Sequence, residues 1–152
     1  MAMKQKRFLF FGIALLIIIL DQLTKFLITS KLAFTESIPL IQNFFHLTLI
    51  KNFGIGFGLM NMPTIRWVLV IVTISIIFAI LHYYKKIPNK YLPVISTSLI
   101  LGGAIGNLID RILFGFVIDF IDFKFWPAFN IADSAVTIGV IGLIIYFWRD
   151  KK

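Results

Sequence analysis

The chain has 152 residues, a length typical of one domain, and 59% of them are hydrophobic while only 14% are charged. Soluble domains carry about 25% charged residues, so this balance and a mean hydropathy of +0.94 exclude an ordinary soluble globule and indicate an integral membrane protein. The absence of cysteine excludes disulfides, thiol catalysis and Cys-ligated metals, and two histidines, His46 and His82, make a His-based zinc site or triad an unexpected outcome.

Four apolar segments are long enough to cross the hydrocarbon core of a membrane, which takes about 20 helical residues. They are Phe8–Ile28, Ile65–Tyr84, Leu92–Leu113 and Ile131–Trp148. The first follows basic residues as a signal peptide would, but its apolar run is long and no small-residue cleavage site follows, so we expect a retained helix. The predicted fold is an all-α membrane protein, a four-transmembrane-helix bundle forming a single domain over residues 1–152.

The net charge of +8 is concentrated at one end of this predicted bundle, which argues for membrane topology and against nucleic-acid binding. With four spans, nine of the fifteen basic residues share the side of both termini: Lys4, Lys6, Arg7, Lys85, Lys86, Lys90, Arg149, Lys151 and Lys152. Because cytoplasmic loops are rich in Lys and Arg, we expect both termini in the cytoplasm. The segments Ser30–Thr64 and Phe114–Asn130 then lie on the outer side.

The first outer segment is too long for a simple turn and shows strand-like alternation. His46 to Leu49 alternates polar and apolar residues, and Phe53, Ile55, Phe57 and Leu59 continue the period of two with glycines between them. We expect a small extracytoplasmic β-sheet within residues 30–64, the alternative being a flexible Gly-rich loop. For the second outer segment we expect an outer loop or short helix.

Polar residues within the spans gather near their outer ends. Asp21 and Lys25 form an i,i+4 pair with the acid first, the favourable order. Asp110, near the end of the third span, opposes the helix dipole and needs a cationic partner, for which the adjacent Arg111 is the candidate. Gly102, Gly103 and Gly106 precede these residues with a small-residue spacing suited to close helix packing.

Three aspartates occupy the stretch from Gly115 to Ser134, which joins the last two spans. An ionisable group at membrane depth is a functional candidate because it is costly there. Asp133 follows Asn130, a good N-cap residue, and would sit in the first turn of the last helix. Paired with Asp119 or Asp122 from a separate element, it could form a carboxylate dyad that shares one proton and activates water. Such chemistry requires no metal and no cofactor.

Each of these signals also has a purely structural explanation, and it is their placement at one depth that favours a catalytic site. A proton-coupled transporter or channel is the main alternative, because buried charged residues also build ion pathways. Against it, the inner half of every span is apolar and no internal repeat is present. A non-enzymatic scaffold protein is the second alternative, although it would not need uncompensated aspartates.

Five blocks of this sequence together resemble the lipoprotein signal peptidases (signal peptidase II), aspartyl proteases of the bacterial inner membrane. The blocks span most of the chain: Asp21-Gln22-Leu23-Thr24-Lys25, Asn52-Phe53-Gly54, Gly103 to Arg111, Val117-Ile118-Asp119-Phe120 and Phe129-Asn130-Ile131-Ala132-Asp133. The chain departs from the family's usual pattern at Ile55-Gly56-Phe57, where small residues normally precede the Phe.

The resemblance implies that Asp119 and Asp133 are the catalytic aspartates, which decides between Asp119 and Asp122. It implies supporting or substrate-binding roles for Asp21, Lys25, Asn52, Gly54, Asn107, Asp110, Arg111 and Asn130. The implied reaction removes the signal peptide of a prolipoprotein just before a diacylglyceryl-modified cysteine. The implied partners are that lipid-modified substrate, membrane lipid and globomycin-type cyclic-peptide inhibitors, with no nucleic acid and no obligate protein subunit.

Overall fold

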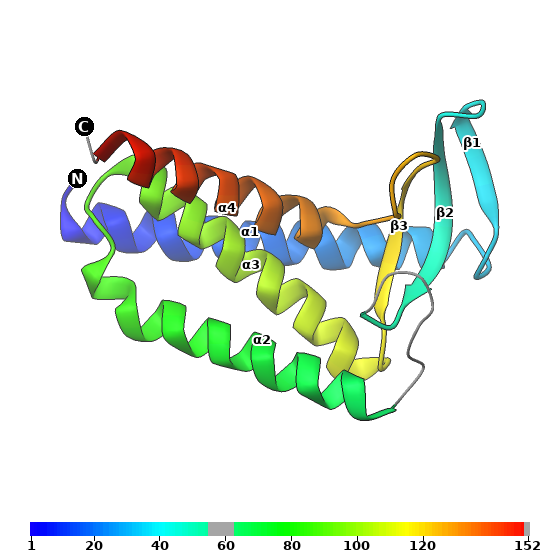
Figure 1. The fold of residues 1–152 in the computed structure, drawn as a ribbon, viewed down its shortest axis with the longest axis horizontal. Coiled ribbons are helices and arrows are strands. Elements are labelled where there is room, and N and C mark those ends of the chain that lie inside the picture. Colours follow the sequence, from blue (N-terminus) through cyan, green and yellow to red (C-terminus); the bar gives the residue numbers. More distant parts are fainter. Residues whose placement is uncertain (55–62, 151–152) are drawn as a thin grey trace.

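The computed structural model describes residues 1–54 and 63–150, which form four long helices and a three-stranded sheet (Figure 1). The helices are α1 (Met3–Thr29), α2 (Pro63–Tyr83), α3 (Tyr91–Leu113) and α4 (Ile131–Asp150), with a 3₁₀ turn, η2 (Tyr84–Lys86), after α2. All four have the length and hydropathy of membrane spans. Both ends of the described chain lie at one end of the bundle and the sheet lies at the other. The four predicted spans are confirmed.

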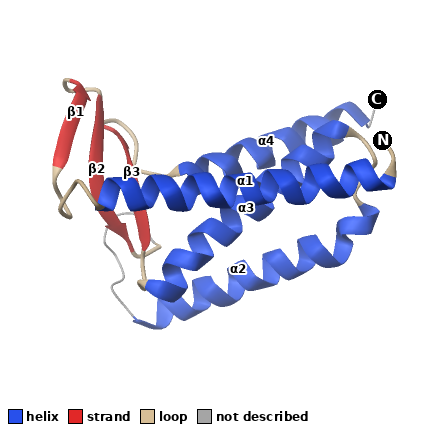
Figure 2. Ribbon diagram, turned by 180° about the vertical axis from the view of Figure 1, so that it is seen from behind, coloured by secondary structure: helices blue, strands red, loops and turns tan. Residues whose placement is uncertain are grey.

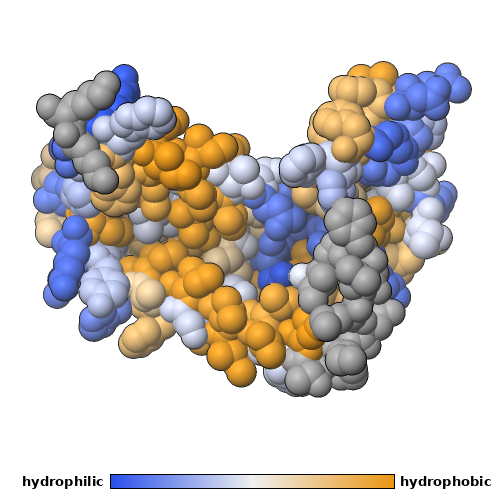
Figure 3. Space-filling model, viewed as in Figure 1, coloured by the Kyte–Doolittle hydropathy of each residue, from blue (hydrophilic) through white to orange (hydrophobic). Residues whose placement is uncertain are grey.

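Helix α3 is the centre of the bundle. It packs against α1, α2 and α4, whereas α2 packs mainly on α3. Accordingly, 56% of the apolar window of α3 is buried within the protein, against 6% for the window of α2. The exposed helix surfaces are largely hydrophobic (Figure 3). On α2, for example, Ile71 and Phe78 are each more than 60% exposed. Such surfaces suit a lipid environment and would be costly in water.

Small residues let the helices approach closely at the positions that the sequence indicated. A Cβ atom added to Gly106 of α3 would lie 2.7 Å from Asp21 Oδ2 and 3.3 Å from the Cβ of Ala132. One added to Gly103 would lie 2.4 Å from the carbonyl oxygen of Ala132. The start of α4 is therefore held against α3 by contacts that only glycine permits.

The sheet comprises β1 (Ser37–Ile41), β2 (Phe45–Asn52) and β3 (Val117–Phe123), all antiparallel in the order β1-β2-β3. Its strands run across the end of the bundle (Figure 2). The small sheet expected from the sequence is thus confirmed. Its predicted continuation through Ile55, Phe57 and Leu59 lies outside the described residues.

The segment between α3 and α4 differs from the loop or short helix expected for it, because it contains β3. Its β-branched and aromatic residues favour a strand, and pairing with β2 supplies the hydrogen bonds that a loop would lack. Asp119 lies opposite Ile50 and Asp122 lies opposite His46, with a register shift between these two pairs. The third strand thus carries two of the candidate aspartates.

Substituting Gly106 tests whether the α3–α4 contact is as tight as its distances indicate. We expect Gly106→Ala to lower the free energy of unfolding by about 1–3 kcal/mol, because the methyl group would push against Asp21 and Ala132. The matched control is Gly12→Ala, where no atom lies within 4 Å of the added Cβ. There we expect no loss, or a gain of up to about 1 kcal/mol from helix propensity. Thermal unfolding in detergent measures both, and equal effects would contradict this packing.

Candidate active site

A buried cluster of one cation and two carboxylates joins α1 to α3 at the sheet end of the bundle. Lys25 Nζ lies 2.7 Å from Asp21 Oδ2 and 2.8 Å from Asp110 Oδ2. All three side chains are almost fully buried. The i,i+4 pair expected from the sequence is confirmed, and the cluster also includes Asp110 from another helix.

The expected partner of Asp110 was wrong, since Lys25 and not Arg111 forms the ion pair. Consecutive residues on a helix point about 100° apart, so Arg111 cannot face the cluster that its neighbour enters. Within residues 1–54 and 63–150 the Arg111 guanidinium makes no hydrogen bond. Its backbone carbonyl accepts one at 2.9 Å from Arg66 Nε of α2.

Both carboxylates also hold the backbone of the elements that follow α3. Asp21 Oδ1 accepts the N–H of Ala132 at the start of α4, at 3.0 Å, and Asp110 Oδ2 accepts the N–H of Ile118 in β3, also at 3.0 Å. Gln22 adds a donor that the predicted site omitted, with Nε2 3.0 Å from Asp110 Oδ1 and 3.2 Å from Asp21 Oδ2. Its place beside Asp21 in the first sequence block was the available signal.

Two asparagines connect this cluster to the candidate aspartates. Asn107 Oδ1 accepts hydrogen bonds from Lys25 Nζ and Asn130 Nδ2, both at 3.1 Å, and Asn107 Nδ2 donates to Asp133 Oδ1 at 2.7 Å. Asn130 Nδ2 donates to Asp119 Oδ1, also at 2.7 Å. The side chains of α1, α3, β3 and α4 therefore form one continuous hydrogen-bond network.

Asn130 and Asp133 begin α4 as the sequence indicated. The Asp133 N–H donates to Asn130 Oδ1 at 2.8 Å, and the Asn130 N–H donates back to Asp133 Oδ2 at 3.3 Å. This reciprocal pair is a capping box that fixes the Asp133 carboxylate over the first turn of the helix. It leaves the Asn130 amide nitrogen free to reach Asp119.

Asp119 lies beside Asn130 because the chain folds back after β3. Phe129 exchanges backbone hydrogen bonds with Ile121, its N–H donating at 3.0 Å and its carbonyl accepting at 2.9 Å. This return sets the next residue, Asn130, beside Asp119. Residues eleven apart in sequence are thus brought together by one backbone pairing.

Asn52 approaches Asp119 from β2. Its Nδ2 donates to Asp119 Oδ2 at 2.8 Å, while its Oδ1 accepts the Gly54 N–H at 2.8 Å. Gly54 has φ of +101°, a backbone conformation that other residues rarely adopt. Because the Gly54 N–H is a donor, it bonds the oxygen of the Asn52 amide. The amide nitrogen of Asn52 is thereby turned towards the Asp119 carboxylate.

The surroundings of Asp119 favour its protonated form. Burial of the side chain, which is 1% exposed, and then the charge of Asp133 raise the pKa of Asp119 to about 7, against the hydrogen bonds from Asn52 and Asn130. A carboxyl group poised near neutral pH can hold or release a proton in a reaction.

Asp122 lies in different surroundings, as expected for a residue three positions along a strand. It accepts hydrogen bonds from Thr48 Oγ1 and Lys124 Nζ, both at 2.6 Å. Burial opposes ionisation there, but these two donors prevail and lower the pKa of Asp122. It is a paired carboxylate on the other face of the sheet, with no hydrogen bond to Asn130 among the described residues.

The network brings together Asp21, Lys25, Asn52, Gly54, Asn107, Asp110, Asp119, Asn130 and Asp133. Asp119 and Asp133 share Asn130 as a hydrogen-bond partner, and no direct hydrogen bond joins them in the part of the chain that the structure describes. A surface cavity of about 370 Å³ borders Asp133, lined also by Trp126, Phe129, Ser134, Thr137 and Ile138. Within residues 1–54 and 63–150, no group of three His, Asp or Glu side chains could hold a metal ion.

Solved structures define the class of this protein. Two of them, both described as bacterial membrane enzymes, match with TM-scores of 0.83 and 0.81 at 37% and 36% identity. The first match covers 92% of this chain and 87% of the other, and the second covers 91% of each. The fold is that of a bacterial membrane enzyme.

Sequence relatives define the family. The family model described as signal peptidase (SPase) II matches residues 13–149. Lipoprotein signal peptidases of Halothermothrix orenii and Moorella thermoacetica are each 46% identical over 140 residues, which is 92% of this chain and 95% and 91% of those proteins. The chain belongs to the signal peptidase II family and is a peptidase. The enzyme class expected from the sequence is confirmed.

Replacing Lys25 tests whether the buried cluster holds the site together. We expect Lys25→Met to lower the free energy of unfolding by about 3–5 kcal/mol, because it leaves two carboxylates buried without their cation. The control is Lys124→Met, since the Lys124 side chain is 39% exposed and its ion pair with Asp122 should contribute less than about 1 kcal/mol. Chemical denaturation measures both, and a Lys25 variant as stable as the control would contradict this role.

Proposed function

We propose that this peptidase removes the signal peptide from prolipoproteins, cleaving on the N-terminal side of a diacylglyceryl-modified cysteine, with Asp119 and Asp133 as its catalytic pair. The single observation that carries the assignment is that Asn130 hydrogen-bonds both carboxylates, which come from separate elements. Membership of the signal peptidase II family supports the substrate class.

In the proposed reaction the two carboxyl groups hold one proton between them. The ionised member, assigned to Asp133, takes a proton from a water molecule as the water oxygen bonds to the scissile carbonyl carbon. Asp119, whose pKa of about 7 favours its protonated form, donates its proton to the carbonyl oxygen. When the C–N bond breaks, Asp133 donates the proton that it took from water to the leaving amine, and a hydroxyl proton of the tetrahedral intermediate returns to Asp119 as the new carboxylic acid forms. The pair titrates as a unit, so the assignment names the dominant form of each carboxyl.

The neighbouring residues position this pair. Asn52, Asn107 and Asn130 donate to the carboxylates, and Gly54 orients the first of these amides. The Asp21–Lys25–Asp110 cluster holds β3 and α4 in place. We assign Arg111, which lies at the same level, to substrate contact or support of the site.

The enzyme belongs in the bacterial inner membrane. Its excess of basic residues lies at the end of the bundle that holds both termini, which places the termini in the cytoplasm. The catalytic pair then faces the outer leaflet, where a lipid-anchored peptide presents its scissile bond while its acyl chains remain among membrane lipids. Cyclic peptides of the globomycin type are the expected inhibitors, and no protein subunit is required.

Three isosteric substitutions test the catalytic pair. We expect Asp119→Asn and Asp133→Asn each to lower the rate of cleavage of a lipidated preprotein by at least about 10²-fold, since each removes a proton-transfer group. Asp122→Asn is the control and should retain activity, because that carboxylate bonds Thr48 and Lys124 instead. All three should unfold at similar temperatures in detergent. Full activity in either of the first two variants, or dependence on added metal, would refute the proposal.

The pH profile tests the assignment of the proton to Asp119. Its protonated fraction falls as pH rises through about 7, so kcat/KM should fall on the alkaline side with an apparent pKa near that value. The Asn52 hydrogen bond stabilises the carboxylate, so Asn52→Ala should raise this apparent pKa and move the alkaline limb to higher pH.

Thr48→Val is the control for this shift, because Thr48 donates to Asp122 and should leave the limb in place. If the alkaline limb of kcat/KM in the Asn52 variant is unchanged or moves to lower pH, another group limits the reaction.

A further inference from the structure

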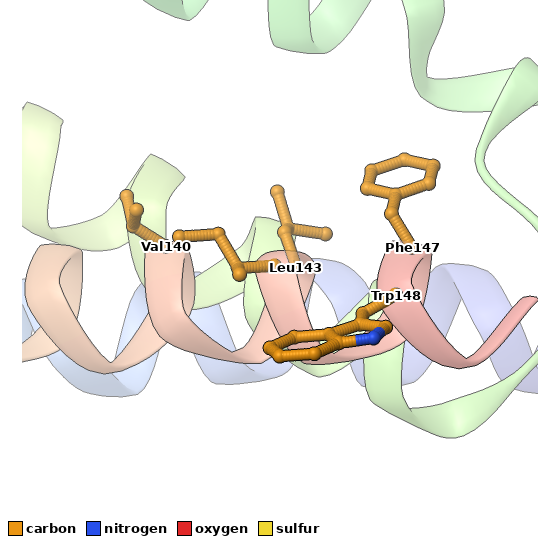
Figure 4. Close-up of a pocket in the computed structure, with 5 residues that line it drawn as sticks. Val140, Leu143, Phe147 and Trp148 are labelled. Carbon is orange, nitrogen blue, oxygen red and sulfur yellow. The ribbon is translucent and has the colours of Figure 1, made fainter. Parts of the chain in front are cut away.

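One exposed face of α4 runs from Asp133 towards the other end of the bundle. The cavity beside Asp133 includes Thr137 of the next turn. A second surface cavity, of about 500 Å³, continues along the same helix and is lined by Val140, Leu143, Ile144, Phe147 and Trp148 (Figure 4). Two depressions therefore occupy successive turns of a single helix.

Five of the nine α4 residues that line the two cavities follow helical periodicity. Asp133, Thr137, Val140, Ile144 and Phe147 recur at alternating intervals of four and three, which places them on one side of α4. At about 1.5 Å per residue, this face extends about 22 Å from Asp133 to Trp148. We call it the α4 groove, defined by Thr137, Val140, Leu143, Ile144, Phe147 and Trp148.

Four residues that line the α4 groove, Val140, Ile144, Phe147 and Trp148, are each more than 40% exposed. Helix α4 turns its small residues, Gly139 and Gly142, towards Ser96 of α3. On the groove side Ile144 is 57% exposed and Trp148 is 71% exposed. The surface is apolar along its length and becomes polar only at the end that holds Asp133.

We infer that the α4 groove binds the apolar helical segment of the substrate's signal peptide, an inference that rests on the proposed function. The hydrophobic segment of a signal peptide has about 7–15 residues, and as a helix it is about 10–22 Å long. That length matches the groove, which ends at the carboxylate of Asp133.

The direction of the chain fits as well. A signal peptide has its basic N-terminal region in the cytoplasm and its cleavage site beyond the hydrophobic segment. With both termini of the enzyme cytoplasmic, the signal helix lies antiparallel to α4, entering beside Trp148 and bringing the scissile bond to Asp133. Ser134 and Thr137 line the polar end of the cavity, where the substrate backbone must leave its helix to be cleaved.

Neighbouring isoleucines give a matched pair of variants. Ile144 lines the groove, whereas Ile145 points about 100° away and is also partly exposed, at 43%. We expect Ile144→Trp to raise KM for a full-length lipidated preprotein at least threefold with kcat little changed, because the indole fills the groove. Ile145→Trp should leave both constants unchanged.

A short lipidated peptide that spans the cleavage site but lacks the apolar segment separates recognition from catalysis. It does not reach Ile144, so all three proteins should cleave it at the same rate. Loss of this activity in the Ile144 variant would mean that the substitution damages the catalytic site, and would overturn the groove assignment. If the unsubstituted enzyme cleaves neither substrate, it is the proposed function that fails.

Because the chain contains no cysteine, single cysteines report contact directly. With Asp119→Asn present to prevent turnover, Ile144→Cys should form a disulfide with a cysteine placed in the apolar segment of the signal peptide, and Ile145→Cys should not. Equal crosslinking at both positions, or equal KM for both Trp variants, would assign this face to membrane lipid alone.

Discussion

The site depends on one buried ammonium group, that of Lys25, held between two carboxylates. A charge enclosed in this way is stable only when it is paired and hydrogen-bonded. Lys25 meets that condition with Asp21 and Asp110, and each carboxylate then accepts a backbone N–H, one at the start of α4 and one in β3. A single cation thereby fixes where the two elements that carry the candidate catalytic residues begin.

Between this charged cluster and the candidate catalytic pair, Asp119 and Asp133, lies a layer of neutral amides. Asn107 contacts both Lys25 and Asp133, and Asn130 contacts both Asp119 and Asp133. An amide donor orients a carboxylate but stabilises its charge less than an ammonium in direct contact would. At Asp122 the direct bonds from Lys124 and Thr48 outweigh burial and lower the pKa, whereas at Asp119 burial and then the charge of Asp133 outweigh the amide donors and raise the pKa to about 7.

The sequence predicted the features that depend on local spacing. Hydropathy located the four spans, the i,i+4 interval indicated the Asp21–Lys25 pair, and Asn130 marked the start of α4. Contacts between elements that are distant in sequence could not be predicted from spacing. Lys25 reaches Asp110 only because α1 and α3 pack together, and Asn130 reaches Asp119 only because Phe129 pairs back onto β3. Adjacency in sequence favoured Arg111 for Asp110, although neighbours on a helix point apart.

In the proposed mechanism, helix α4 links substrate recognition to chemistry. Its first turn holds Asp133 in a capping box, and its remaining turns form the apolar groove in which we place the signal helix. Because both belong to one rigid helix, a substrate segment seated against the groove has its cleavage site at a fixed height relative to Asp133. Productive orientation can supply a large part of a catalytic barrier. The register of the signal helix along α4 would then select the bond that is cut, with the lipid anchor holding the other side.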